Sequence, residues 1–358
     1  MNTIANIEAE LLGSPRKWLV TGAAGFIGSH LAERLLALGQ SVVALDNFET
    51  GNPENLAAVT ARGGAQAARR FQFIEGDVRE LDVCRAACAG IDIVLHEAGL
   101  GSVPRSIANP IATHEVNVSG FLNMMVAARD AGVGRFVYAT SSSVYGDLPG
   151  LKKVEDTLGI PLSPYALSKL IDEQYARIFA QVYGVESIGL RYFNVFGPRQ
   201  DPAGAYAAVI PRWAATLRAH EECVIYGDGE TSRDFCYVDN VVQANILAGM
   251  AERGSASVNQ IYNVGAGAET SLNELYALIR ERLSTFDPGL RAALATHQAF
   301  RAGDVRRSLA DIGKAKRLLG YAPAHTVASG LDETLGVKTP HRSPAHSIAA
   351  PASSEASR

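Results

Sequence analysis

The sequence predicts an α/β protein in which a doubly wound parallel sheet is joined by a smaller, interleaved C-terminal α/β domain. Up to residue 191, short apolar segments alternate with amphipathic segments, a pattern typical of parallel strands covered on both faces. After that point the alternation ends and loops rich in Gly, Pro and Asp appear. The expected strands are 17–21, 41–45, 71–75, 91–95, 135–140 and 186–191, and the expected helices between them are 26–38, 80–88, 115–131 and 165–183.

The domain organisation follows from the same pattern. The sheet domain is expected to cover residues 17–193, with segments of about 235–265 returning to it. Residues 194–335 are expected to form mainly a substrate-binding domain. Its expected helices lie near 206–219, 239–252, 271–284 and 310–319.

The two ends of the chain differ from each other. Residues 1–16 predict an N-terminal helical extension, because Ile4, Ile7, Leu11 and Leu12 would share one face of a helix. Residues 336–358 are mostly Thr, Pro, Ser, Ala and His without periodicity, which predicts a disordered tail.

The composition excludes several classes of protein. Of the 358 residues, 47% are hydrophobic and 20% are charged, as in ordinary globular proteins. The formal net charge is −4 and no basic stripe occurs, so we expect no nucleic-acid partner. The sequence contains no apolar run of membrane-spanning length and no signal-peptide pattern, which predicts a cytoplasmic protein without a membrane partner. The four cysteines and eight histidines lack metal-ligand spacing, so no metal site is expected.

A glycine-rich turn follows the first expected strand. Gly22, Gly25 and Gly28 have the spacing Gly-x-x-Gly-x-x-Gly. Gly22 permits a tight turn, Gly25 lets backbone amides approach a pyrophosphate at the helix N-terminus, and Gly28 lets that helix lie close to the strand. Because a strand and a helix flank the motif, the sequence predicts a Rossmann-type dinucleotide site.

Asp46 ends the second expected strand, 18 residues after Gly28. A carboxylate at this position can accept hydrogen bonds from the ribose hydroxyls of adenosine, and it repels a 2′-phosphate. The position therefore favours NAD over NADP. The competing interpretation is that Asp46 only caps the turn formed with Asn47 and Phe48.

The next two strand ends carry weaker signals. Asp77 and Val78 close the third strand and could contact the adenine, although Gly-Asp is also typical of an ordinary turn. His96 ends the fourth strand and is expected to be a packed histidine without a catalytic role. Ala98 and Gly99 are small enough for the backbone to run close to the cofactor.

The candidate catalytic residues lie after the fifth strand and at the start of the next helix. Ser141, Ser142 and Ser143 follow that strand, while Tyr165 and Lys169 are four residues apart and would share a helix face. A lysine ammonium beside a phenol stabilises the phenolate and lowers a pKa that is ordinarily ~10. We therefore expect Tyr165 to be a general base for a sugar hydroxyl, with Ser141 bonding the same hydroxyl and Ser142 and Ser143 in support.

The chain resembles the extended short-chain dehydrogenase/reductase family over residues 17–335, and the similarity is closest to bacterial UDP-N-acetylglucosamine 4-epimerases. The segments that carry the resemblance are 22–28, 45–48, 100–106, 141–146, Tyr165 with Lys169, 190–197 and 227–235. Two features depart from the family pattern: Gly99 replaces the usual alanine, and the C-terminus is polar where relatives end on aromatic residues.

The resemblance implies the remaining site residues and an assembly. For the cofactor it implies Gly22, Gly25, Phe26, Ile27, Gly28, Asp46, Asn47, Gly51, Asp77, Val78, Ala98, Tyr165, Lys169, Tyr192 and Val195. For the substrate it implies Ser102, Arg105, Ser141, Ser142, Tyr165, Asn194, Ala208, Val209, Tyr226, Arg233, Arg301, Asp304 and Ser308, with the two arginines Arg233 and Arg301 pairing with a diphosphate. It also implies a homodimer formed through the helices near 115–131 and 165–183.

The resemblance implies an NAD-dependent 4-epimerase of UDP-N-acetylhexosamines, acting through a transient 4-keto sugar in the supply of surface polysaccharide precursors. Ser308 would leave room for an N-acetyl group where epimerases of plain hexoses have a tyrosine. The competing interpretation of Ser308 is a helix N-cap, because Asp311 follows three residues later.

Three alternatives remain open. The first is an epimerase of UDP-N-acetylhexosaminuronic acids. The second is a 4,6-dehydratase or decarboxylase, whose relatives carry an acidic residue where this chain has Ser142 and Ser143. The third is a non-catalytic NAD-binding protein, against which the joint presence of Ser141, Tyr165 and Lys169 argues.

Overall fold

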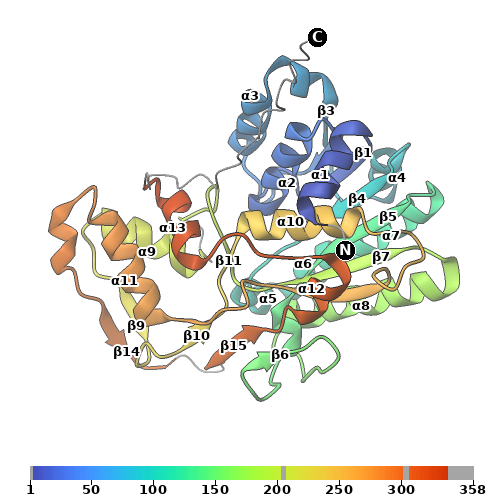
Figure 1. The fold of residues 1–358 in the computed structure, drawn as a ribbon. Helices are drawn as coiled ribbons and strands as arrows, with labels where there is room; N and C mark the ends of the chain where they lie inside the picture. The colour runs from blue at the N-terminus through green and yellow to red at the C-terminus, as the bar shows by residue number, and fades with distance from the viewer. Residues whose placement is uncertain (1–2, 203–206, 301–305, 338–358) are drawn as a thin grey trace, which may run out of the picture.

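The centre of the molecule is a parallel sheet of seven strands in the order β12-β7-β5-β4-β1-β2-β3 (Figure 1). The structure is a computed structural model that describes residues 3–202, 207–300 and 306–337. The first six strands lie where the apolar segments predict them, and a seventh comes from residues 260–264. In chain order they are β1 Lys17–Thr21, β2 Ser41–Asp46, β3 Phe71–Glu75, β4 Ile93–His96, β5 Arg135–Ser141, β7 Ser187–Tyr192 and β12 Gln260–Val264.

Helices cover both faces of this sheet, which explains why its strands are apolar throughout. Trp18 and Val20 of β1 enter one core, whereas Leu19 enters the core on the opposite face. The prediction of a doubly wound parallel sheet is confirmed. The first face carries α1 Ile4–Gly13, α2 Phe26–Ala37, α3 Pro53–Arg70, α10 Val238–Gly249 and α12 Gly313–Leu319, and the second carries α4 Leu81–Cys88, α7 Gly120–Asp130 and α8 Pro164–Tyr183.

One residue of the N-terminal helix α1 does not lie on the buried face that was expected for it. Ile7 and Leu11 are buried against the sheet domain, and the Thr3 side chain caps the helix. Leu12, expected on the same face, is 61% exposed. Successive residues of a helix are separated by about 100°, so Leu12 points away from the face that holds Leu11.

Several elements were not expected from the sequence. The Ala-rich helix α3 was not predicted because its apolar pattern is weak. It is broken at Gly64, whose φ is +63°. Two short helices, α5 Val103–Ala108 and α6 Pro110–His114, precede a π-helical turn at Glu115–Ser119 within the expected helix 115–131. The last helix described is α13 Val327–Leu335.

A second lobe contains small sheets and its own core (Figure 1). Helices α9 Val209–Arg218 and α11 Leu272–Leu283 enclose this core, in which Trp213, Ile225 and Tyr276 are buried. The strands are β13 Thr270–Ser271, β10 Ser232–Arg233, β15 Arg307–Ala310 and β6 Lys152–Lys153 in one sheet, β8 Val195–Phe196 with β11 Cys236–Tyr237, and β9 Val224–Tyr226 with β14 Thr296–Gln298.

The helix expected near 310–319 begins later than predicted. Residues 307–310 form strand β15, which pairs with β10 and β6, and α12 begins only at Gly313. Ser308 is therefore a strand residue opposite Arg233, and its interpretation as a helix N-cap is wrong. The strand conformation of this segment results from its pairing with two strands that are distant in the sequence. Local periodicity does not show such pairing.

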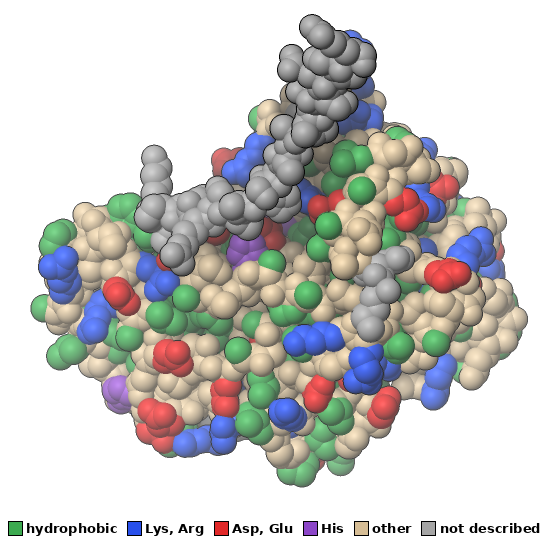
Figure 2. Space-filling view, viewed as in Figure 1, with side chains coloured by type: hydrophobic (Ala, Val, Ile, Leu, Met, Phe, Trp, Pro, Cys, Tyr) green, Lys and Arg blue, Asp and Glu red, His purple; other side chains and the backbone are tan. Residues whose placement is uncertain are grey.

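The surface and interior agree with the composition. Figure 2 shows acidic and basic side chains interspersed over the face in view, without a large area of one sign. Among the residues described, no helix has both the length and the apolar character to cross a membrane. The four cysteines are buried thiols that form no disulfide.

Candidate functional site

The glycine turn connects β1 to α2 in the manner the spacing predicts. Gly22 has a φ of +66°, and a Cβ added there would lie 2.8 Å from the backbone nitrogen of Ala98. A Cβ at Gly28 would collide with the carbonyl oxygen of Gly22. Gly25 is the N-cap of α2 and offers no side-chain cap, so backbone amides at this helix end are available to an anionic group.

Hydrogen bonds to Asp46 connect the glycine turn to the end of β2. Its carboxylate accepts hydrogen bonds from the backbone nitrogens of Ala24, at 2.9 Å, and of Phe48, at 2.8 Å. Burial raises the pKa of Asp46, and the backbone hydrogen bonds oppose this shift. The turn-capping interpretation is thus confirmed. Because a carboxylate has about four acceptor positions, its role toward ribose hydroxyls remains compatible and stays a prediction.

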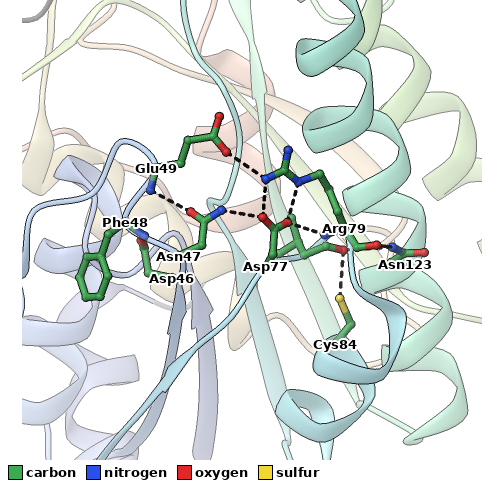
Figure 3. A network of polar contacts seen from close by, with 9 residues as sticks. Asp46, Asn47, Phe48, Glu49, Asp77, Arg79, Cys84 and Asn123 are labelled. Carbon is green, nitrogen blue, oxygen red and sulfur yellow. Dashed lines mark hydrogen bonds and ion pairs between the residues drawn. The ribbon is translucent and has the colours of Figure 1, made fainter.

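Asp77 belongs to a polar network that joins the ends of β2 and β3 (Figure 3). It accepts hydrogen bonds from Asn47, at 2.7 Å, and from the guanidinium of Arg79, which also pairs with Glu49. The hydrogen bond from Arg79 is the main reason that the pKa of Asp77 is lowered. Sequence analysis did not identify Arg79 or Glu49. A pocket beside this network is lined by residues that include Gly22, Asp46, Asn47, Asp77, Val78, Ala98 and Leu100.

His96 is a packed histidine, as expected. Its Nδ1 atom lies 2.8 Å from the Thr21 hydroxyl, and its ring contacts Phe121 and Phe136. Burial lowers the pKa of His96 to about 3, so the imidazole is neutral at physiological pH.

Ser141 ends β5 and accepts hydrogen bonds from Ser143 through both the backbone nitrogen, at 3.1 Å, and the hydroxyl, at 3.0 Å. The segment 142–145 that follows contacts α8, the helix that carries Tyr165 and Lys169. Tyr165 lies in the first turn of α8, which the side chain of Ser163 caps. The fold therefore places the serines and the Tyr–Lys pair at the carboxyl edge of the sheet.

Lys169 is almost completely buried and has two partners. Its ammonium donates to the carbonyl oxygen of Ala139 at 3.1 Å and to Asp172 at 3.3 Å. Asn117 supports this region from another element, since its side chain bonds Ser168 at 3.0 Å and both backbone groups of Leu100. Neither Asp172 nor Asn117 was predicted from the sequence to be part of the site. For Asp172, its place three residues after Lys169 was the available signal.

A partly buried carboxyl group also lies directly after β4. Glu97 accepts a hydrogen bond from the Tyr192 hydroxyl at 2.7 Å, and Asn245 donates to the same hydroxyl at 2.8 Å. Burial raises the pKa of Glu97 to about 8, although Tyr192 and Lys169 oppose the shift. Tyr192 was expected to contact the cofactor, and Glu97 was not identified from the sequence.

The expected substrate residues lie on several elements of both lobes. Asn194 has a φ of +29° and donates to the carbonyl oxygen of Asp234 at 2.9 Å, beside the β8–β11 pair. Ala208 is the N-cap of α9, and Tyr226 ends β9. Ser102 caps the short helix α5 through the backbone nitrogen of Arg105, and Val209 begins α9. Arg301 and Asp304 lie outside the described residues.

Arg233 and Ser308 are paired in register on the adjacent strands β10 and β15. The Arg233 guanidinium donates to the carbonyl oxygen of Ser232 at 2.8 Å. Next to Arg233, burial raises the pKa of Asp234 to about 6. The backbone amides of Ala266 and Gly267 donate hydrogen bonds to the Asp234 carboxylate. These hydrogen bonds connect the sheet that contains β10 and β15 to the loop after β12.

Comparison with known proteins gives the family. The sequence model of the NAD dependent epimerase/dehydratase family matches residues 18–265. The UDP-glucose 4-epimerase of Mycolicibacterium smegmatis is 37% identical over 88% of this chain and 96% of its own length. A dTDP-glucose 4,6-dehydratase of Streptomyces griseus is 35% identical over 91% of this chain and 94% of its own length.

Solved structures agree with these relatives. The UDP-N-acetylglucosamine 4-epimerase from Methanobrevibacter ruminantium, in complex with UDP-N-acetylmuramic acid, has a TM-score of 0.81 and 33% identity, covering 90% of this chain and 97% of that one. The UDP-glucuronic acid 4-epimerase from Bacillus cereus has a TM-score of 0.78 and 29% identity, covering 89% and 98%. The chain therefore belongs to the NAD dependent epimerase/dehydratase family, the extended short-chain dehydrogenase/reductases that its sequence motifs indicated.

Proposed function

We propose that this enzyme is an NAD-dependent UDP-sugar 4-epimerase whose substrates are UDP-N-acetylhexosamines, and that it serves the synthesis of surface polysaccharide precursors. The observation that carries the proposal is that Ser141 at the end of β5, Tyr165 and Lys169 on α8, and the glycine turn after β1 all belong to the carboxyl edge of one parallel sheet. The names of the relatives support 4-epimerisation, and the small side chain of Ser308 beside Arg233 supports the N-acetyl substrates.

The residues of the turn fit a dinucleotide. A Cβ at Gly22 would collide with the backbone of Glu97 and Ala98, and one at Gly28 with the carbonyl of Gly22, so only glycine allows this close turn, which Asp46 holds in place. When bound, NAD would supply the acceptor and donor of the C4 hydride. The residues proposed to hold it are those implied by the sequence, including Asn47, Val78, Tyr192 and Val195.

In the proposed reaction, Tyr165 removes the proton of the C4 hydroxyl and returns it after the sugar has turned over. Lys169 stabilises the phenolate, and Ser141 orients the hydroxyl. Contacts with the nucleotide, among them Asn194 and Arg233, keep the 4-keto sugar in the pocket between the two half-reactions. Inversion at C4 then involves no net oxidation.

Two alternatives have observations in their favour. A relative named UDP-glucuronate 4-epimerase, at 30% identity, supports a uronic acid substrate. Dehydratase relatives support elimination chemistry, but Ser142 and Ser143 supply no carboxyl group for it, and the hydroxyl of Ser143 is bonded to Ser141. The constellation of Ser141, Tyr165 and Lys169 favours an enzyme over a non-catalytic NAD-binding protein.

The proposal includes a homodimer formed by the helices on the second face of the sheet. Apolar side chains of α8 remain exposed in the single chain, with Leu167 at 49%, Ile178 at 45% and Val182 at 63%. The neighbouring short helices contribute Ile107 and Ile111, which are 63% and 70% exposed. A second copy would remove these apolar side chains from water.

The substrate assignment is tested by incubating the enzyme with UDP-glucose, UDP-N-acetylglucosamine and their uronic acids, followed by separation of the C4 epimers. Ser308→Tyr should abolish turnover of the N-acetylated pair and spare UDP-glucose, because the larger ring occupies the space of the acetamido group. Ser308→Ala, which keeps the space and removes the hydroxyl, is the matched control and should retain the wild-type preference. If Ser308→Tyr turns over acetylated and plain sugars as the wild type does, the N-acetyl assignment loses this support.

A further inference from the structure

A buried carboxylate contacts the lysine of the proposed catalytic pair. Asp172 lies one helical turn after Lys169 on α8, and its Oδ2 atom is 3.3 Å from the lysine Nζ. Asp172 is 0% exposed and Lys169 is 5% exposed. The other oxygen of Asp172 has no hydrogen-bond partner within the described residues. Such a carboxylate is costly to bury unless the lysine charge compensates it.

The geometry around Lys169 restricts the ammonium strongly. Of its three protons, the carbonyl oxygen of Ala139 and the carboxylate of Asp172 use two, which leaves one for a ligand. On a third side, a Cβ added at Gly99 would lie 3.6 Å from Nζ. Asp172 thus helps to fix the position of the nitrogen on which the proposed function depends.

The charges in this region are closely balanced. Burial acts to lower the pKa of Lys169, and the negative charges of Asp172, Tyr165 and Glu97 outweigh it, so that its pKa is raised. Burial raises the pKa of Asp172 to about 7, and Lys169 opposes that shift. The protonation of each partner therefore depends on the charge of the other.

We propose that Asp172 is a positioning residue of the active site, which fixes the Lys169 ammonium against Ala139 and sets the pH range in which the Tyr165–Lys169 pair works. This inference rests on the proposed function of that pair. A carboxylate beside the pair makes every nearby group hold its proton more tightly. The other charged or titratable groups around the two residues are Tyr165 and Glu173 of α8, His96 and Glu97 at the end of β4, Tyr138 of β5 and Arg191 of β7.

The sign of the expected effect is the same for each of these groups. Asp172→Asn keeps the volume of the side chain and removes its negative charge. With less negative charge nearby, Lys169 and the acidic groups around it lose their protons at lower pH. Both limbs of the pH profile of kcat should therefore move to lower pH, by on the order of one pH unit. A side chain that only filled space would lower kcat or stability without moving the profile.

The test compares the pH profiles of wild type, Asp172→Asn and Asp130→Asn. Asp130 lies at the end of α7, pairs with Arg129 at the surface and should leave the profile unchanged when its charge is removed. Displacement of both limbs in Asp172→Asn alone supports the proposal. Superimposable profiles of Asp172→Asn and wild type would overturn it.

A second measurement does not depend on activity. In urea unfolding, Asp172→Asn should lower the midpoint of the wild type, because it leaves Lys169 buried without a counter-charge. In the background of Lys169→Met the same change should have a small or reversed effect. Equal shifts in both backgrounds would show that the two residues do not act as a pair. If the wild type epimerises no UDP-sugar, the proposed function fails, while this cycle still decides the pairing.

Discussion

Burial and neighbouring charges determine the protonation states of individual side chains in this site. His96 is neutral because it is buried, and the charge of Lys169 also opposes its protonation. Burial likewise raises the pKa of Glu97 to about 8, in contact with Tyr192. Lys169 remains the cation among these groups. A positive charge near Tyr165 is the environment that a phenolate base requires.

Removal of the proposed base should separate binding from chemistry. Tyr165→Phe keeps the aromatic ring and removes the proton acceptor, so turnover of the UDP-sugar should fall by on the order of 10²–10⁴-fold while substrate affinity persists. Steady-state rates give the first quantity, and calorimetric titration with the UDP-sugar gives the second. Tyr183→Phe, at the far end of α8, is the matched control and should turn over like wild type. Near-normal turnover of Tyr165→Phe would show that another group is the base.

The elements around the proposed cofactor site are positioned by close backbone approach. Helix α2 can begin shortly after β1 because Gly28 leaves room for the carbonyl of Gly22, and Gly22 leaves room for the backbone of Glu97 and Ala98. Asp46 fixes this turn to β2, and Arg79 with Asp77 fixes the end of β3. Three strand ends are thereby held at one edge before any ligand binds, which reduces the cost of ordering the site.

A side chain at the strand–helix contact should disrupt cofactor binding. In Gly28→Ala the new Cβ meets the carbonyl oxygen of Gly22, and overpacking of this kind costs about 1–3 kcal/mol. We expect the purified variant to retain roughly a tenth or less of the NAD of wild type, measured in the nucleotide released on denaturation. Gly13→Ala, whose Cβ would meet nothing within 4 Å, should retain NAD fully. Equal NAD contents in all three proteins would contradict the assigned role of Gly28.

At the level of the molecule, the two faces of the sheet have different surroundings. On the first face α10 lies between α1, α2 and α12, and the second lobe packs its own core around α9 and α11. On the second face α8 leaves a row of apolar side chains exposed. This asymmetry is the physical basis of the proposed dimer.

Charged residues on the exposed side of α8 should prevent dimerisation. Sedimentation at micromolar concentration should show a dimer for wild type and a monomer for the double variant Ile178→Glu and Val182→Glu, because the variant places carboxylates in the proposed apolar interface. Leu12→Glu, at a similarly exposed position on α1, should remain dimeric. A monomeric wild type at this concentration would refute the proposed assembly.

The parallel sheet and the places of the glycine turn, Ser141, Tyr165 and Lys169 could be predicted from the sequence, because these follow from local periodicity and from residue spacing within single elements. The position of Ser308 in a strand beside Arg233 became visible only in the folded structure. The tertiary structure also brought Glu97 to Tyr192, and it determined how Lys169 and Asp172 are paired and buried. These contacts depend on which distant strands become neighbours and on how much water the fold removes, and neither quantity is encoded in a local pattern.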